Sequence, residues 1–362
     1  MSISDARRPS ASVALAQRRS WRHSTARVRR VTRTLLTAGA LVLACTSPSL
    51  AATFKIATVS PDGSVWMKLL RGASTEIEAR TDGRVRLKLY PGGVMGDDRA
   101  MMRKMRVGQL QGAVVTTGVF NRIFPDLSLY NLPMQFRSLA EVDHVRPRFD
   151  AELMQGLEDA GFISVGFAEV GMAYAMATRE VRSLVDARRL KVWTPHGDEM
   201  AAKALVDFGI TPVPLTISDV LAGLQTGLID TVAAPLVGAV ALQWHGPLKY
   251  VLDLPFMYIY APMVLVKRPF ERLDPEDQAV MRKVLGAAVG DADARNRRDH
   301  DAVRKVLQGQ GLTFLRPSPA EVQEWQARAD EVTRRWVAGG VVTSARYERF
   351  AARLGEFRAK PN

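Results

Sequence analysis

The side chains that most often perform catalysis or bind metals are scarce and scattered in this sequence. Beyond residue 51 the histidines are His144, His196, His245 and His300, and no two of them have the i,i+4 spacing of a helical zinc motif. The one cysteine, Cys45, lies before that point, so the remaining chain has neither a disulfide nor a thiolate ligand. We therefore expect no bound metal ion and no cofactor.

Motifs of nucleophilic or nucleotide chemistry are also missing. There is no nucleophile elbow, no Walker loop and no dinucleotide fingerprint between a strand and a helix. The glycine-rich segment 92–96 precedes a helix, but Asp97 and Asp98 would repel a phosphate there, so it predicts a turn. Segment 196–198 (His-Gly-Asp) offers a candidate base, although its place after a strand favours a helix cap. If the protein were an enzyme, the side chains of His196 and Asp198 would have to lie close to Glu169 in the folded chain.

Aromatic, hydroxyl and amide side chains instead collect where predicted strands end. In open α/β sheets, ligands bind beyond the carboxyl ends of the strands, so loops from two lobes can face one cleft. We predict that this set binds a small molecule, with ordinary core packing as an equally good interpretation of the two tryptophans. The predicted substrate-binding residues are Asp62, Thr116, Thr117, Glu169, Tyr174, Trp193, Ala234, Gln243 and Trp244.

Two stretches of alternating strands and helices position these loops. Apolar residues alternate in the strands and recur with helical spacing between them, which predicts an α/β fold with a largely parallel sheet. The first stretch has strands at 54–58, 85–89 and 110–115, with helices at 66–81 and 97–107. The second has strands at 162–167, 173–178, 191–194, 212–215 and 228–233, with helices at 198–208 and 219–225.

The C-terminal third is predicted to be mainly helical. A helix from 274 to 307, with Asp274 as its cap and Pro275 at its first position, would extend about 50 Å, which is longer than one lobe is wide. We expect it to lie across both lobes. Ser318 and Glu321 form a capping-box pattern that predicts a further helix docking the tail.

Five sequence blocks, in order, resemble one family. These are residues 61–64 (P-D-G-S), 83–96 (G-R-V…P-G-G-x-x-G), 131–136 (N-L-P-M-Q-F), 224–235 (L-Q-T-G-L-I-D…P) and 249–250 (K-Y). The chain is identified as similar to the DctP-type extracytoplasmic substrate-binding subunits of tripartite ATP-independent periplasmic (TRAP) transporters. The resemblance implies a two-lobe periplasmic binding protein with a hinge, which captures a small-molecule ligand by lobe closure and delivers it to the membrane permease subunits.

The family's pattern also implies lobe boundaries and a change in the ligand. We expect lobe I at 52–171 plus 259–298, and lobe II with the C-terminal helices at 172–258 plus 299–362. Members that bind organic acids carry an arginine where this chain has Trp193, and an asparagine where it has Ala234. An arginine fork pairs bidentately with a carboxylate. We therefore expect an aromatic or hydrophobic acid, an amine or a neutral molecule, and neither a simple dicarboxylate nor sialic acid.

Composition and charge favour an exported binding protein. The 362-residue chain has a formal charge of +13, but residues 1–51 hold nine arginines, no lysine and one aspartate, so they supply +8 and leave +5 for the rest. Such a balance does not indicate a nucleic-acid partner. Arginines at 27–33, an apolar stretch at 35–44 and small residues at Ser49 and Ala51 predict a signal peptide over 1–51.

We therefore expect a periplasmic monomer that is not an enzyme. Cleavage after Ala51 is favoured over lipid attachment at Cys45, because Leu43 fits a lipidation site poorly. Two alternatives stay open, namely a protein that presents its ligand to a sensor, and a periplasmic enzyme on the same fold.

Overall fold

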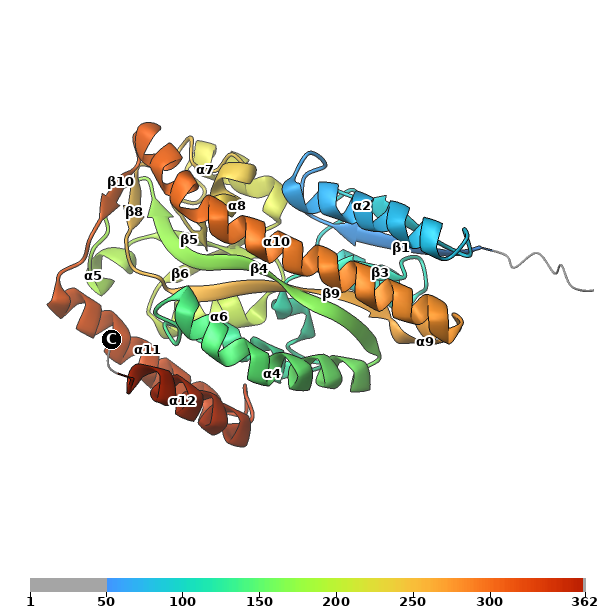
Figure 1. Ribbon diagram of the computed structural model, residues 1–362. Helices are drawn as coiled ribbons and strands as arrows, with labels where there is room; N and C mark the ends of the chain where they lie inside the picture. The colour runs from blue at the N-terminus through green and yellow to red at the C-terminus, as the bar shows by residue number, and fades with distance from the viewer. Residues whose placement is uncertain (1–50, 361–362) are drawn as a thin grey trace, which may run out of the picture. The chain divides into compact units, whose positions relative to one another are not determined.

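The computed structural model describes residues 51–360, so residues 1–50 of the predicted signal peptide, with Cys45, lie outside the described residues. In this part of the chain, strands join into one mixed sheet in the order β2-β1-β3-β9-β4-β7-β5-β6, with β8 pairing β4 and β10 (Figure 1). The strands are β1 (Ala52–Thr58), β2 (Val85–Tyr90), β3 (Gly112–Val114), β4 (Phe162–Ala177), β5 (Lys191–Pro195), β6 (Thr211–Leu215), β7 (Thr231–Pro235), β8 (Tyr250–Leu252), β9 (Met257–Val266) and β10 (Thr313–Leu315).

Helices cover the sheet and join its strands. The α-helices are α2 (Val65–Arg80), α3 (Asp98–Arg106), α4 (Leu139–Asp159), α5 (Leu184–Ala187), α6 (Glu199–Asp207), α7 (Val220–Thr226), α8 (Leu236–Ala241), α9 (Lys267–Glu271), α10 (Pro275–Gly309), α11 (Pro319–Ala338) and α12 (Ser344–Arg358). Short 3-10 helices are η2 (Thr117–Phe120), η3 (Pro125–Asn131) and η4 (Ile217–Asp219). No helix of residues 51–360 is long and apolar enough to cross a membrane.

The sheet consists of two parallel halves joined by long antiparallel strands. We call β1, β2 and β3 with α2 and α3 the first lobe, and β5, β6 and β7 with α6 and α7 the second lobe. Within each lobe the central strand pairs in parallel with its neighbours. Strands β4 and β9 pair with each other and pass from one lobe to the other. The carboxyl ends of the parallel strands are therefore the edges at which the two lobes can share a ligand.

Strand β4 differs from the prediction. The sequence predicts separate strands at 162–167 and 173–178, but β4 is continuous over 16 residues. Its register against β9 shifts between Ser164 and Gly166 and again between Glu169 and Gly171, and both glycines have positive φ angles of 149° and 114°. These bulges interrupt the apolar alternation without ending the pairing, because glycine adopts such angles readily.

The long helix and the capping box agree with the sequence. Helix α10 has 35 residues and Pro275 at its start, although Asp274 makes no capping side-chain bond. It contacts α2 at one end, β4 in its middle and α8 near the other lobe, so it spans both lobes (Figure 1). Ser318 and Glu321 form the predicted capping box of α11.

The C-terminal helices divide between the two sides. Helix α11 contacts second-lobe elements, since Trp336 Nε1 donates to Asp207 Oδ2 at 2.6 Å. Helix α12 packs on α4, where Arg349 pairs with Glu152 at 2.6 Å. Our predicted boundaries place α4 in lobe I and residues 299–362, including α12, in lobe II. The packing of α12 on α4 crosses that boundary, so the division of the C-terminal helices between the lobes stays a prediction.

Candidate ligand-binding site

The buried side chain of Asp98 lies beside the C-terminal end of strand β3. Asp98, at the start of α3, accepts hydrogen bonds from Thr116 N and Thr116 Oγ1 at 2.9 and 2.6 Å. It is only 8% exposed, and its Oδ1 has no hydrogen-bond partner among the described residues. Burial raises the pKa of Asp98, which the Thr116 bonds oppose and the charges of Asp97 and Asp198 reinforce. The sequence indicated Asp98 only as a helix N-terminal residue, so its place at the site was missed.

Thr117, the next predicted residue, is tied to the crossing strands. Its hydroxyl donates to Asn131 Oδ1 at 2.7 Å, and Asn131 Nδ2 donates to the carbonyl of Tyr258 in β9 at 2.8 Å. The end of β3 is therefore fixed both to α3 and to β9.

Two tryptophans meet in the second lobe. The rings of Trp193 and Trp244 are 5.0 Å apart in a T-shaped arrangement, and both side chains are buried. Trp193 Nε1 donates to the carbonyl of Leu215 at 3.0 Å, so the polar end of this indole is already bonded. Gln243, just after α8, is exposed and has a positive φ of 58°, which reverses the chain before Trp244 enters the core. The predicted contact of Trp193 with a ligand would therefore have to use the ring, and it stays a prediction.

Tyr174 and Ala234 face each other across the strands. They are paired residues in the antiparallel register of β4 and β7, and both are buried. Burial raises the pKa of Tyr174, and the charge of Asp253 adds to this effect. Tyr174 is therefore neutral at ordinary pH and can act only as an uncharged aromatic or hydroxyl group.

The two predicted carboxylates lie apart from these groups and are ion-paired. Glu169 is 2% exposed and faces α10, where Arg297 Nε and Nη2 bind its oxygens at 2.8 and 2.6 Å and Tyr258 Oη donates at 3.0 Å. The exposed Asp62 pairs with Arg71 of α2. Neither is an unpaired anion at the strand ends, and their role in the site stays a prediction.

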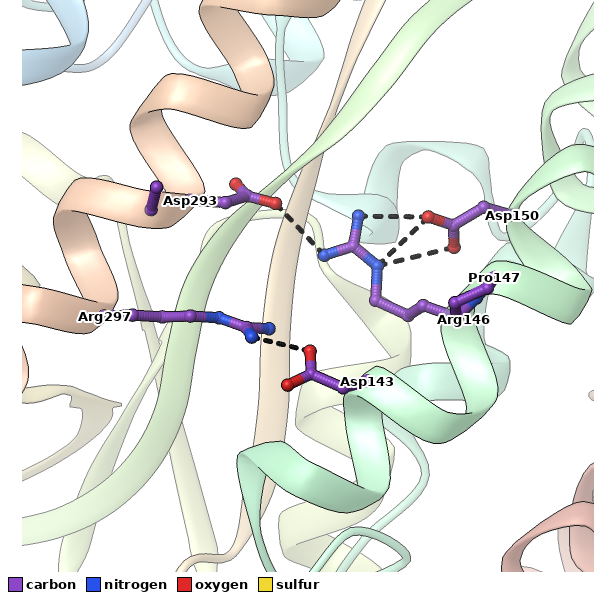
Figure 2. Close-up of a pocket in the computed structure, with 7 residues that line it drawn as sticks. Asp143, Arg146, Pro147, Asp150, Asp293 and Arg297 are labelled. Atoms are coloured by element: carbon purple, nitrogen blue, oxygen red, sulfur yellow. Dashed lines mark hydrogen bonds and ion pairs between the residues drawn. The ribbon is translucent and has the colours of Figure 1, made fainter.

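A cavity of about 430 Å³ lies between α4 and α10, beside the pairing of Glu169 (Figure 2). Arg146 pairs there with Asp150 at 3.1 Å and Asp293 at 3.3 Å, and also donates to Tyr258 Oη at 2.9 Å. Burial raises the pKa of Asp150 and of Asp293, which Arg146 opposes. The lining residues are Asp143, Arg146, Pro147, Asp150, Asp293, Ala294 and Arg297. Because each guanidinium is paired with carboxylates, the network ties α4, β4 and α10 together.

The groups that an enzyme would need bond to separate partners. His196 Nδ1 lies 3.1 Å from Asp97 Oδ2, Asp198 caps α6 through Met200 N and Ala201 N, and Glu169 is held at α10. Within the described part of the chain, no three His, Cys, Asp or Glu side chains form a group that could hold a metal ion. The predicted helix cap in this segment is confirmed at Asp198.

Comparison with known proteins agrees with this architecture. The model of bacterial extracellular solute-binding proteins, family 7 (DctP), matches residues 56–339. The sialic acid-binding periplasmic protein SiaP of Vibrio cholerae is 24% identical over 281 residues, or 76% of this chain and 86% of SiaP. The 2,3-diketo-L-gulonate-binding periplasmic protein YiaO of Escherichia coli is 27% identical over 212 residues, or 57% of this chain and 63% of YiaO.

Solved structures show the same fold. The sugar acid binding protein of Advenella mimigardefordensis in complex with galactonate has a TM-score of 0.78 at 16% identity, over 84% of this chain and 98% of its own. A TRAP periplasmic solute binding protein of Desulfovibrio salexigens with bound orotic acid has a TM-score of 0.75 at 15% identity, over 84% and 99%. The two-lobe α/β architecture is thus confirmed, and the chain belongs to the DctP family of bacterial extracellular solute-binding proteins.

Proposed function

We propose that this protein is the periplasmic receptor of a TRAP transporter, which captures a small organic solute at the strand ends and delivers it to membrane permease subunits. The relatives support this proposal. Two are named for the solutes sialic acid and 2,3-diketo-L-gulonate, and two solved structures hold galactonate and orotic acid. Export through the N-terminal segment, action as a monomer and the absence of catalysis are parts of the same proposal.

The ligand proposed is a small organic acid with a planar or apolar body. The observation that carries this choice is Trp193, which occupies the position where the resemblance expects an arginine, and whose Nε1 is already bonded to Leu215. Without the arginine fork, a carboxylate of the ligand has no bidentate partner at this position, so binding must depend more on the rest of the molecule. An aromatic or apolar surface can instead stack on the indole ring. The structure with orotic acid, a planar acid, shows that the fold can hold such a shape.

The test is a ligand screen by thermal shift and tryptophan fluorescence on the purified protein. The screen includes aromatic acids, hydrophobic acids, amines, dicarboxylates and sugar acids. We expect a saturable response to aromatic or hydrophobic acids, and its loss in Trp193→Arg. A strong response of the wild type to simple dicarboxylates would contradict the proposed ligand class while leaving the receptor role intact.

A matched control separates ligand contact from packing. Trp325 is buried like Trp193 and likewise donates its Nε1 to a backbone carbonyl at 3.0 Å, that of Arg182 in place of Leu215. We expect Trp193→Phe to weaken binding about fivefold, because the smaller ring loses about 1 kcal/mol of stacking surface, and Trp325→Phe to leave binding unchanged. Equal losses in both variants would mean that Trp193 acts through packing alone.

Two other functions predict different observations. A ligand-presenting sensor component would bind a signalling membrane protein in pull-down experiments in place of permease subunits. An enzyme would convert the bound compound, which mass spectrometry of the recovered ligand would detect. We favour transport because the strand ends offer rings and hydroxyl groups, whereas His196 and Glu169, which an enzyme would need together, bond to Asp97 and Arg297.

A further inference from the structure

The two lobes contact each other through charged side chains beside the C-terminal ends of β3 and β5. The segment after β5, residues 196–199, packs against the start of α3 and the loop after η2. We call the five side chains that pair across this contact the clasp. They are Asp97, Arg99 and Arg122 from the first-lobe side and His196 and Glu199 from the second lobe.

Glu199 is the centre of the clasp. Its Oε1 accepts from Arg122 Nη2 at 2.7 Å and from Arg99 Nη2 at 3.2 Å, and its Oε2 accepts from Arg122 Nε at 3.3 Å. An exposed ion pair taken alone contributes little, but a carboxylate held by two arginines forms a network. Both arginines lie at sequence distances of 77 or more from Glu199, so these bonds link separate lobes and do not stabilise one local element.

A second pair lies next to it. His196 Nδ1 is 3.1 Å from Asp97 Oδ2, and Asp97 also accepts from Ala100 N at 2.8 Å as the cap of α3. Partial burial would raise the pKa of Asp97, but the bonds from Ala100 and His196 outweigh it, and the pKa is lowered. Asp97 is therefore an anion at neutral pH and attracts the imidazole.

Glycines allow this close approach. A Cβ on Gly118 would lie 2.3 Å from Asp198 Cγ, and a Cβ on Gly197 would lie 2.2 Å from Arg99 Cδ. Asp198 also accepts from Asn121 Nδ2 at 3.4 Å across the same contact. A side chain at Gly118 would displace the Asp198 carboxyl group, and one at Gly197 would displace the Arg99 side chain, so the contact is fitted in shape as well as in charge.

We propose that the clasp holds the two lobes closed over the strand ends and thereby slows solute exchange. Opening the lobes must break the Glu199 bonds, which adds an electrostatic barrier that salt screens. The effect on exchange rests on the proposed function, and it would act mainly on the rate of dissociation. The closure itself does not depend on which ligand binds.

The test measures the distance between the lobes in the protein without added ligand. Spin labels are placed at Val107→Cys, at the end of α3, and Val206→Cys, in α6, because both side chains are well exposed. The full chain carries Cys45→Ser, which removes its natural cysteine. Double electron–electron resonance then reports the populations of short and long distances.

We expect the wild-type protein to populate the short distance beside the long one, and Glu199→Gln to reduce the short-distance population at least fivefold. Raising the salt from about 0.05 to about 0.5 M should shift the wild type the same way and Glu199→Gln much less. The matched control is Glu76→Gln, which removes an exposed carboxylate that pairs with Arg80 inside α2. It should leave the distances unchanged.

An unchanged distance distribution in Glu199→Gln would overturn the proposal. Arg122→Gln provides a second variant, since its side chain is 80% exposed and its loss should not affect folding. It should produce a smaller shift in the same direction, because Arg99 still holds Glu199. Because no ligand is added, failure here leaves the proposed ligand class untouched, and failure of the ligand screen leaves the clasp untouched.

Discussion

Polar groups around the crossing strands and polar groups at the ligand-binding strand ends are held in different ways. Beside β4 and β9, Arg297 binds the buried Glu169 of β4 and Asp143 of α4. Arg146 binds Asp150 of its own helix and Asp293 of α10. At the strand ends, the buried groups are the rings of Trp193 and Trp244 and the one-sided carboxyl of Asp98. Paired charges therefore hold together the region where β4 and β9 pass between α4 and α10, which we call the hinge, whereas the buried groups of the site are mostly uncharged.

This difference suggests how a binding protein can change its ligand without losing its fold. The charged network that joins α4, β4 and α10 does not touch Trp193 in any contact described above, so a substitution at Trp193 need not disturb this network. The predictions below test whether stability and binding can be separated in this way.

The largest effect on stability is expected at the hinge. Arg297→Met leaves Glu169 buried beside Tyr258 with no cation, and breaking such a pair costs about 3 kcal/mol of unfolding free energy. Urea denaturation measures the change. Arg282→Met is the control on the same helix, because its pairing with Glu158 is half-exposed, and it should cost under about 1 kcal/mol.

A double variant sharpens this prediction. Glu169→Gln combined with Arg297→Met removes both charges, so it should recover about 1 kcal/mol or more relative to Arg297→Met. If Arg297→Met lowered the unfolding free energy no more than Arg282→Met does, the charged network at the hinge would not stabilise the fold. The contrast between the hinge and the strand ends would then be wrong.

Local signals account for what the sequence predicted. The capping box of Ser318 and Glu321, the 35-residue α10 and the parallel halves of the sheet all follow from residues close together in the chain. The break predicted within β4 was wrong. The bulges at Gly166 and Gly171 interrupt the alternation of apolar residues, which in the sequence cannot be distinguished from the end of a strand.

The distant contacts could not be predicted from spacing. Glu169 and Arg297 are 128 residues apart, and His196 and Asp97 are 99 apart, so only the folded chain brings them together. The meeting of Trp193 with Trp244 has the same origin. The sequence predicts which loops surround the site, and this stays a prediction. Whether a carboxylate in these loops is unpaired or neutralised depends on partners from other elements.

A smaller, pH-dependent effect is expected at Asp98. Because the pKa of Asp98 is raised in the folded protein, its protonated form is favoured there, and its contribution to stability is present at low pH and lost as pH rises through the folded pKa. Asp98→Asn removes this titration. The melting temperature at pH 7, relative to that at pH 4, should therefore be a few degrees higher in the variant than in the wild type.

The control for Asp98 is a carboxylate with the opposite shift. Asp207 has a lowered pKa, since its bonds with Trp336 and Lys203 outweigh the effect of burial. Its stabilisation is present above the unfolded pKa and lost as pH falls toward the folded pKa, so Asp207→Asn should change the pH dependence in the other direction. Identical pH profiles for wild type and Asp98→Asn would mean that the strand-end carboxyl is not held in a strained, one-sided environment.

The smallest effect is expected at Asp62, which pairs with Arg71 at the surface near the first-lobe loop. Because this side chain is 65% exposed, Asp62→Asn should change the unfolding free energy by less than about 0.5 kcal/mol. Since Arg71 already neutralises the carboxylate, the affinity for the ligand found in the screen should change by less than about threefold. A larger loss of affinity at unchanged stability would instead place Asp62 among the ligand contacts. In that case a charged side chain at the strand ends would bind the ligand, and the contrast between a charged hinge and a mostly uncharged site would not hold at Asp62.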